Sequence, residues 1–452
     1  MKLMTKGSPI KLIVRFTIPL LIGNLVQQLY NFSDALVVGR AIGVNALAAV
    51  GATSGVISLI IGFAVGMTSG LGIPTAKAFG NQNKSEITRS FVTSIYITLG
   101  VSIIMTLFSY IFSRPLLLYM QTPSEIIDDA VLFSRVIFLG SGATMFYNLL
   151  NSQIRALGNS RTPLFFLVIS CFINVILDLI MVVGLNFGIT GAAVSTVLAQ
   201  IFSSVCCLLY IKYKIPELKL ERTDFIFKWI DIRSHLSIAL PMGFQQSIIA
   251  IGTVVLQSML NTLGTTSIVA YTTASRIDQL AILPSASFGI AMATYTAQNL
   301  GAKKITRIRK GVHQTMILNC TLSLFIGLLI ILFGENLVQM FVGPGQTEVL
   351  DLTNKYFLIN SSMYWVLGIL FTIRYTLQGL GKKAAPTLAG IFELSARIFA
   401  GLILIPSLGF LGAAMDSPLA WIGSVLVLIP SYIHVMKNLK TVEDNELLLS
   451  NE

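Results

Sequence analysis

The sequence predicts an all-α membrane protein whose twelve transmembrane helices form two six-helix lobes, related by a pseudo-two-fold axis along the membrane normal. Three observations lead to this fold: a shortage of charge, a series of long apolar stretches and an internal repeat. Only 11% of the 452 residues are charged, whereas 54% are hydrophobic. A soluble domain carries about 25% charged residues. This chain therefore cannot cover a water-facing surface, and most of its exterior must face lipid.

A helix needs about 20 mostly apolar residues to cross the hydrocarbon core of a bilayer. The chain contains twelve such stretches, at 12–38, 46–75, 88–112, 127–156, 162–184, 190–211, 235–261, 266–298, 311–333, 351–379, 384–405 and 411–436. Lys and Arg gather in alternate gaps, above all in 212–234 and 303–310. Because cytoplasmic loops collect these residues, we expect a multi-pass protein of the cell (inner) membrane with both termini in the cytoplasm. The first stretch exceeds the h-region of a signal peptide, so we expect it to be retained.

Segments of the first half recur in the second half at a nearly constant offset. The matched positions are Gly43 and Gly264, Gly80 and Gly301, Gly191 and Gly412 (each 221 residues apart), and Pro163 and Pro386 (386 − 163 = 223). Each half contains six spans, so both halves enter the membrane in the same direction, and substrate sites of such parallel repeats lie near the repeat interface. The predicted organisation is an N-lobe at 1–211, a cytoplasmic linker at 212–234, a C-lobe at 235–440 and a C-terminal tail at 441–452.

Several classes of function do not suit this composition. The net charge of +11 resides in short gaps between spans, not on a basic folded face, so we expect no nucleic-acid partner. All four cysteines lie inside apolar stretches, where they are typical of small apolar fillers and not of a disulfide or metal site. The three histidines are far apart and no phosphate-loop motif is present, so we expect neither an enzyme nor a cofactor.

Polar residues inside the first-half spans are the candidate functional residues. An intramembrane carboxylate costs several kcal/mol unless it is paired, wetted or neutralised, and it usually marks an ion or proton path. Asp34 shares one helix face with Gln27 and Asn31, with Tyr30 one turn before it, and Asn174 shares a face with Asp178. A third stripe comprises Thr144, Asn148, Asn151 and Arg155. These stripes can line one hydrated cavity, and Pro19 is a candidate helix bend beside Asp34.

The second half carries its buried charges at other positions. They are Arg276, Asp278, Glu393, Arg397 and Asp416. Glu393 and Arg397 stand at i and i+4, a spacing that allows an ion pair within one helix. Because opposite charges lie close in sequence here, we favour a structural role for them and place the ion chemistry in the first half.

The ensemble of twelve spans, paired Gly80 and Gly301 junctions, and Gly-x-x-Gly-Ala-Ala entries to the sixth and twelfth spans resembles the multidrug and toxic compound extrusion (MATE) family. The resemblance covers essentially the whole chain. It implies a cation-binding and coupling site at Asp34, Asn174, Asp178 and Thr196, which would take H⁺ or Na⁺, with Tyr30 and Asn151 as polar neighbours. The acid that another branch of the family carries in the seventh span has no counterpart in 241–261, so a C-lobe cation site is not expected.

The resemblance also implies a secondary active transporter that exports cationic or amphipathic small molecules in exchange for H⁺ or Na⁺ by alternating access. We expect a monomer surrounded by membrane lipids, with Gln27, Tyr30, Asn31, Asn148 and Asn151 in the substrate cavity. The alternative is a flippase for a lipid-linked cell-envelope precursor. A phosphate-bearing substrate would require several basic residues in the cavity, whereas the candidate stripes hold mainly acids and amides.

Overall fold

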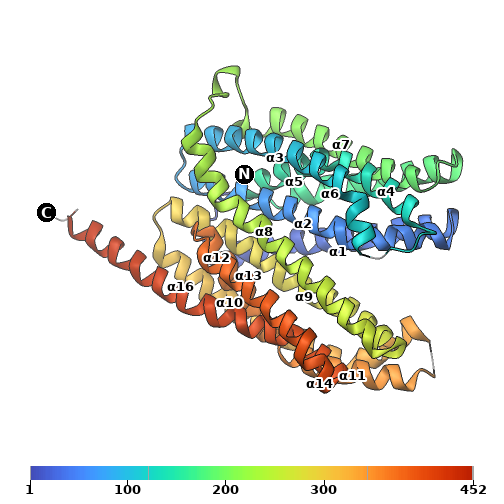
Figure 1. The fold of residues 1–452 in the computed structure, drawn as a ribbon. Helices are drawn as coiled ribbons and strands as arrows, with labels where there is room; N and C mark the ends of the chain where they lie inside the picture. The colour runs from blue at the N-terminus through green and yellow to red at the C-terminus, as the bar shows by residue number, and fades with distance from the viewer. Residues whose placement is uncertain (1, 121, 344, 450–452) are drawn as a thin grey trace. The chain divides into compact units, whose positions relative to one another are not determined.

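Helices are the only regular secondary structure in the part of the chain that the computed structural model describes, residues 2–120, 122–343 and 345–449 (Figure 1). Helices are the expected result, because an isolated strand in hydrocarbon would leave its backbone polar groups without partners. Ten described helices are long and apolar enough to cross a membrane, and two bent pairs bring the number to twelve if each pair is one span. This number agrees with the prediction.

The helices of the first half follow the predicted spans. They are α1 (Pro9–Ala41), α2 (Val44–Gly80), α3 (Lys84–Tyr119), α4 (Ile127–Leu139), α5 (Ser141–Ala156), α6 (Arg161–Asp178), the π-helical turn η1 (Leu179–Gly184) and α7 (Gly188–Lys214). Two 3₁₀ turns, η2 (Pro216–Leu218) and η3 (Arg222–Asp224), lead into the second half. Local chemistry sets some of these ends: Asn83, for example, caps α3 by accepting the Glu86 backbone N–H through its side chain.

The second half repeats this series. Its helices are α8 (Trp229–Leu260), η4 (Asn261–Leu263), α9 (Thr265–Gly301), α10 (Ile305–Val342), α11 (Thr347–Ser362), α12 (Tyr364–Gly379), α13 (Ala384–Phe399), the π-helical turn η5 (Ala400–Leu404), α14 (Ile405–Leu408), α15 (Phe410–Ala414) and α16 (Asp416–Leu449). Even the irregularities recur. The pair α4 and α5 bends by 46° and the pair α11 and α12 by 45°, and each half has a π-helical turn after the helix that begins its fifth span.

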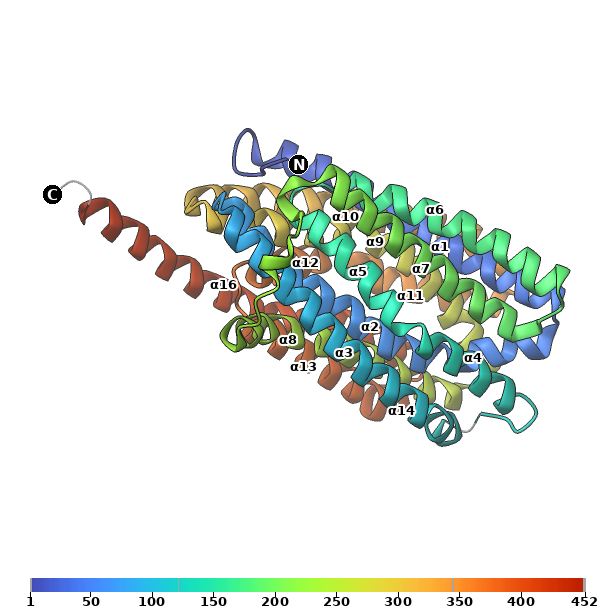
Figure 2. The same ribbon diagram turned by 90° about the horizontal axis from the view of Figure 1, so that it is seen from above.

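The helices form two compact units, which share two helices. One unit contains residues 2–3 and 18–247, and the other contains residues 4–17 and 248–449. The beginning of α1 therefore belongs to the second unit, while the beginning of α8 belongs to the first. Within the first unit α6 and α7 pack side by side, as Figure 2 shows. The lobe boundaries at 211 and 235 stay predictions.

A stripe of glycines lets α2 approach the beginning of α8 closely. A Cβ at Gly66 would lie 2.4 Å from the carbonyl oxygen of Met242, and one at Gly70 would lie 2.7 Å from the Cα of Ala239. Such distances exclude a side chain at either position. The stripe is thus a packing device for two backbones.

We expect Gly66→Ala to destabilise the protein by about 1–3 kcal/mol, the usual cost of overpacking, because the added methyl collides with the α8 backbone. Gly51→Ala is the matched control in the same helix, since nothing lies within 4 Å of a Cβ there. Thermal unfolding of the two purified variants in detergent tests this. Equal midpoints for the two variants would contradict the close approach of α2 and α8.

Candidate functional site

The predicted cation-site residues come together where α1, α6 and α7 meet. The carboxyl groups of Asp34 on α1 and Asp178 on α6 are close neighbours. Two carboxyl groups attract each other only if a proton or another cation lies between them, because two ionised carboxylates repel. Asp34 and Asp178 therefore form the acidic centre of the site.

Neutral side chains complete the site. The Asn174 amide donates a 3.4 Å hydrogen bond to the Thr196 hydroxyl, and the Tyr30 hydroxyl donates one of 3.4 Å to the same oxygen. Tyr30 also lies near both Asp34 and Asp178. The structure thus assembles all four predicted cation-site residues and Tyr30 from three helices.

Local structure explains how Asp178 reaches this position. It is the last residue of α6, and the π-helical turn η1 follows immediately. A π-helical turn widens the helix and breaks its regular rotation, and such turns are frequent at functional sites. The chain then returns through residues 185–187 into α7, whose second turn carries Ser195 and Thr196 opposite α6.

Sequence reasoning missed Ser195. Its hydroxyl donates a 2.8 Å hydrogen bond to the Gly191 carbonyl oxygen, and its side chain lies beside Asp178. Serines are common in these spans, and nothing in the sequence separates Ser195 from the others. Only its position opposite Asp178 identifies it.

Burial raises the free-energy cost of charge on the carboxyl groups of this site. Asn174 and Asp178 are fully buried, and the Oδ1 atom of Asp34 is buried without a hydrogen-bond donor from the described residues. A buried carboxylate oxygen without a partner costs free energy, which a proton or a cation would recover. Carboxylate, amide and hydroxyl oxygens are hard ligands, so the residues present fit either H⁺ or Na⁺.

The predicted cavity residues lie on the same helices but make more local contacts. Gln27 donates a 3.3 Å hydrogen bond to Asn31 one turn further along α1, and Asn148 donates one of 2.8 Å to the Thr144 carbonyl. The Asn151 side-chain oxygen lies 3.9 Å from the Cys207 Sγ on α7. Their role in a substrate cavity stays a prediction. Pro19 lies inside α1, which is helical from Pro9 to Ala41, and its role as a bend is likewise still a prediction.

The ion pair that the spacing of Glu393 and Arg397 allows does not form, and each residue pairs with another helix. Glu393 on α13 pairs with Arg374 on α12 and accepts a 2.8 Å hydrogen bond from Ser424 on α16. Arg397 instead pairs with Asp416 at 2.7 Å. A buried charge needs a closely fitting partner, and neighbouring helices supply one here more directly than the same helix one turn away.

Arg374 was not among the charges that the sequence analysis singled out, although it lies within the predicted tenth span. It is fully enclosed, with 5% of its side chain exposed. Asp278 on α9 also binds across helices: it accepts a 2.7 Å hydrogen bond from the Tyr356 hydroxyl and a further one from the Tyr364 hydroxyl. These contacts join α9 to both members of the bent pair α11 and α12.

The MatE family model matches this chain twice, at residues 19–180 and 241–403. The chain belongs to this family. The two matches begin 222 residues apart (241 − 19), which confirms the internal repeat. The predicted resemblance to MATE proteins is thereby confirmed, and the family is one of transporters, not of enzymes.

Relatives and solved structures agree with this assignment. The chain is similar to the probable multidrug resistance protein YoeA of Bacillus subtilis (strain 168), with 24% identity over 83% of this chain and 82% of the relative. It is also similar to the probable multidrug resistance protein YpnP of the same organism, with 25% identity over 83% and 84%. The outward-facing structure of a multidrug resistance MATE family transporter matches with a TM-score of 0.89 and 23% identity, over 96% of this chain and 97% of that one. This confirms the two-lobe all-α fold.

We expect Glu393→Gln to destabilise this MATE protein by about 3–5 kcal/mol, because it leaves the buried Arg374 guanidinium without a counter-charge. The matched control is Asp351→Asn, which removes the exposed Asp351–Lys355 pair. Exposed pairs of this kind contribute about 0–1 kcal/mol. The measurement is thermal unfolding in detergent, and a Glu393 variant as stable as the control would show that the pair is unimportant.

Proposed function

We propose that this MATE protein is a secondary active exporter of cationic or amphipathic small molecules, driven by H⁺ or Na⁺ moving inward. The observation that carries the proposal is the meeting of Asp34 and Asp178 inside otherwise apolar helices. The printed names of the relatives, multidrug resistance proteins, support small drugs as the substrate class. The basic gaps between spans support a cell-membrane location with cytoplasmic termini.

The acidic pair offers a physical basis for coupling. With no cation bound, two neighbouring carboxylates would repel each other in a medium of low dielectric, and one proton or Na⁺ shared between them removes that repulsion. When a cation is bound, Asp34 and Asp178 can lie close together, and when none is bound they repel each other. The two states therefore favour different distances between α1 and α6. A ligand shifts a conformational equilibrium only through such a difference in affinity for the two states.

Helix α1 can transmit this difference. Asp34 lies in the part of α1 that belongs to the first unit, whereas residues 9–17 of the same helix belong to the second. Pro19 stands next to this change of unit, where its missing N–H weakens the helical hydrogen bonding. We infer that loading the Asp34 site moves α1 about this point and so drives alternating access.

Transport in vesicles tests the proposal. The purified protein is reconstituted and loaded with a fluorescent cation such as ethidium, and H⁺ and Na⁺ gradients are then imposed separately. We expect export to be driven by at least one of the two gradients. Equal rates with and without both gradients would overturn the antiport proposal.

Asp34→Asn should reduce gradient-driven export to the background rate while the protein stays folded. Asparagine has the shape of a protonated carboxyl group but cannot release a proton, and it lacks the charge that holds Na⁺. The matched control is Asp128→Asn, which changes an exposed acid on α4 paired with Arg114. Vesicle export and thermal unfolding are measured for both variants, and wild-type export by the Asp34 variant would exclude its role.

Three further variants separate H⁺ from Na⁺. A proton requires mainly the carboxylates, whereas Na⁺ requires several converging oxygens, including those of Asn174 and Thr196. We propose H⁺ or mixed coupling and expect Thr196→Ala and Asn174→Ala to slow export only several-fold, because each change removes one hydrogen bond of about 1 kcal/mol. Asp178→Asn should slow it more than tenfold. If all three variants lose the same share of export, and only a Na⁺ gradient drives export by the wild type, the hypothesis of H⁺ coupling is wrong.

A further inference from the structure

The linker at 212–234, whose last residues form the first turns of α8, exposes an unusual amount of apolar surface. Five of its side chains, here called the linker cluster, have relative exposures from 46% for Phe225 to 73% for Ile230; the cluster comprises Phe225, Ile226, Phe227, Trp229 and Ile230. A linker surrounded only by water would keep few large apolar side chains in such a position. An apolar or amphipathic environment would therefore stabilise the linker cluster.

An aromatic contact fixes the linker cluster on α3. The Tyr96 ring packs edge-on against Phe225 at 6.3 Å and against Phe227 at 5.8 Å between ring centroids. The Tyr96 hydroxyl also donates a 3.3 Å hydrogen bond to the Phe225 carbonyl. The linker thus lies against the side of α3.

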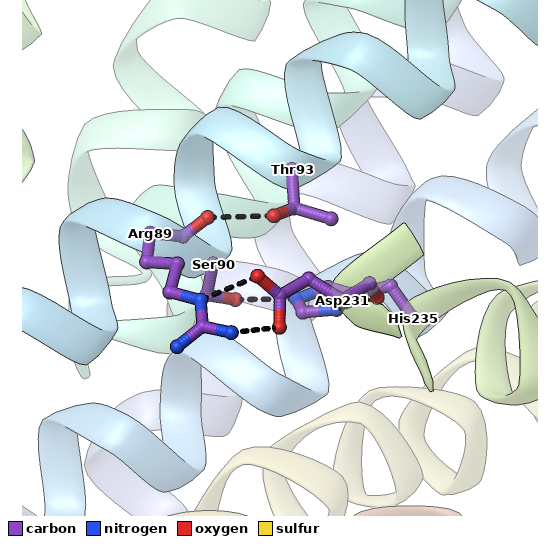
Figure 3. Close-up of polar contacts among 5 residues, drawn as sticks. All are labelled: Arg89, Ser90, Thr93, Asp231 and His235. Carbon is purple, nitrogen blue, oxygen red and sulfur yellow. Dashed lines mark hydrogen bonds and ion pairs between the residues drawn. The ribbon is translucent and has the colours of Figure 1, made fainter. Parts of the chain in front are cut away.

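Polar contacts fix the beginning of α8 on the same helix. Figure 3 shows the Arg89 guanidinium of α3 engaging both carboxylate oxygens of Asp231, through Nε and Nη2. One turn later, His235 lies 2.9 Å from the Ser90 hydroxyl through Nε2, while its Nδ1 lies 2.8 Å from the Asp231 carbonyl oxygen (Figure 3). These contacts hold Trp229 and Ile230, which directly precede Asp231, in place.

The surface of α3 shows what adjoins the linker cluster. Tyr96, Leu99, Ile103 and Leu107 follow one another at helical spacing on one face, and the three aliphatic residues are exposed. Helix α3 is long and apolar enough to span the membrane, so this exposed face is the part that meets lipid. The linker cluster continues the lipid-facing stripe of α3 at its N-terminal end.

Basic residues accompany the cluster. Arg222, Lys228 and Arg233 are exposed within or beside it. Aromatic rings favour the membrane–water interface, and each Lys or Arg near an anionic lipid surface contributes about 1 kcal/mol of attraction. The combination of aromatic, aliphatic and basic side chains is that of an interfacial anchor.

We propose that the linker cluster is a membrane anchor, which inserts into the headgroup and upper acyl region of a leaflet that contains anionic lipid. It holds the start of α8 at a fixed depth, because Asp231 and His235 bind α3 immediately beside it. The connection between the two halves is then attached to the membrane and is not a free loop in water.

Tryptophan fluorescence tests the anchor, because the chain has three tryptophans, Trp229, Trp365 and Trp421. The variant W365F/W421F keeps Trp229 alone and is reconstituted into phosphatidylcholine and phosphatidylglycerol vesicles. We expect strong quenching by lipids brominated near the ester end of the acyl chain, weaker quenching by lipids brominated near the chain end, and little quenching by aqueous iodide. Replacing phosphatidylglycerol with phosphatidylcholine should reduce the bromolipid quenching.

The matched control is W229F/W365F, which keeps the buried Trp421 and should respond weakly to all three quenchers. Adding R89Q to the Trp229-only protein should raise iodide quenching and lower bromolipid quenching, since the start of α8 loses its partner on α3. Strong iodide quenching with no bromolipid effect in the Trp229-only protein would overturn the proposal, since the cluster would then lie in water. Absence of quenching by every reagent would also overturn it, because another protein surface would then cover the cluster.

Discussion

A polar group in hydrocarbon costs several kcal/mol when it has no partner, and every notable feature of this MATE protein responds to that cost. The backbone of the described residues satisfies itself by forming helices. Arg374 and Glu393, both buried, neutralise each other across two helices, and Arg397 and Asp416 do the same. At Asp34 and Asp178 the response is incomplete, since two acids face each other and a buried oxygen lacks a donor. Under the proposed function, a cation that binds beside these two acids would lower the electrostatic free energy of the buried pair.

The two halves share one fold but use it differently. A π-helical turn follows Asp178 in the first half and Phe399 in the second, so the same irregular position carries an acid in one half and an aromatic ring in the other. The second half instead closes its buried charges with opposite charges and tyrosine hydroxyls. The two halves are thus equivalent scaffolds that differ in their buried charges. Among the described residues, two acids lie beside each other in the first half, whereas Glu393 and Asp416 of the second half each pair with an arginine.

Two helices, α1 and α8, connect the two compact units. Helices α1 and α8 each begin in one compact unit and continue in the other, so each helix links the two. The start of α8 is fastened to α3 by an ion pair and a histidine hydrogen bond, and the proposed anchor attaches the same place to the membrane. Asp34 of the proposed cation site also lies in such a helix, α1. Coupling through a continuous helix requires no chain of side-chain contacts, because a helix moves largely as a rigid element.

The sequence by itself determined the helices, their number, the repeat and most residues of the proposed cation site. These features depend on composition, on period and on the high cost of an isolated intramembrane carboxylate, all of which are local properties. Tertiary structure alone decided which groups meet: Ser195 beside Asp178, Arg374 beside Glu393, and Tyr96 beneath an exposed linker. The i and i+4 spacing of Glu393 and Arg397 allowed a pair within α13. Each residue instead pairs with a neighbouring helix, because packing sets the rotation of α13 about its axis. Two partners that lie far apart in the chain produce no pattern in the sequence near either one. The charge pairs therefore became known only from the packing of the helices.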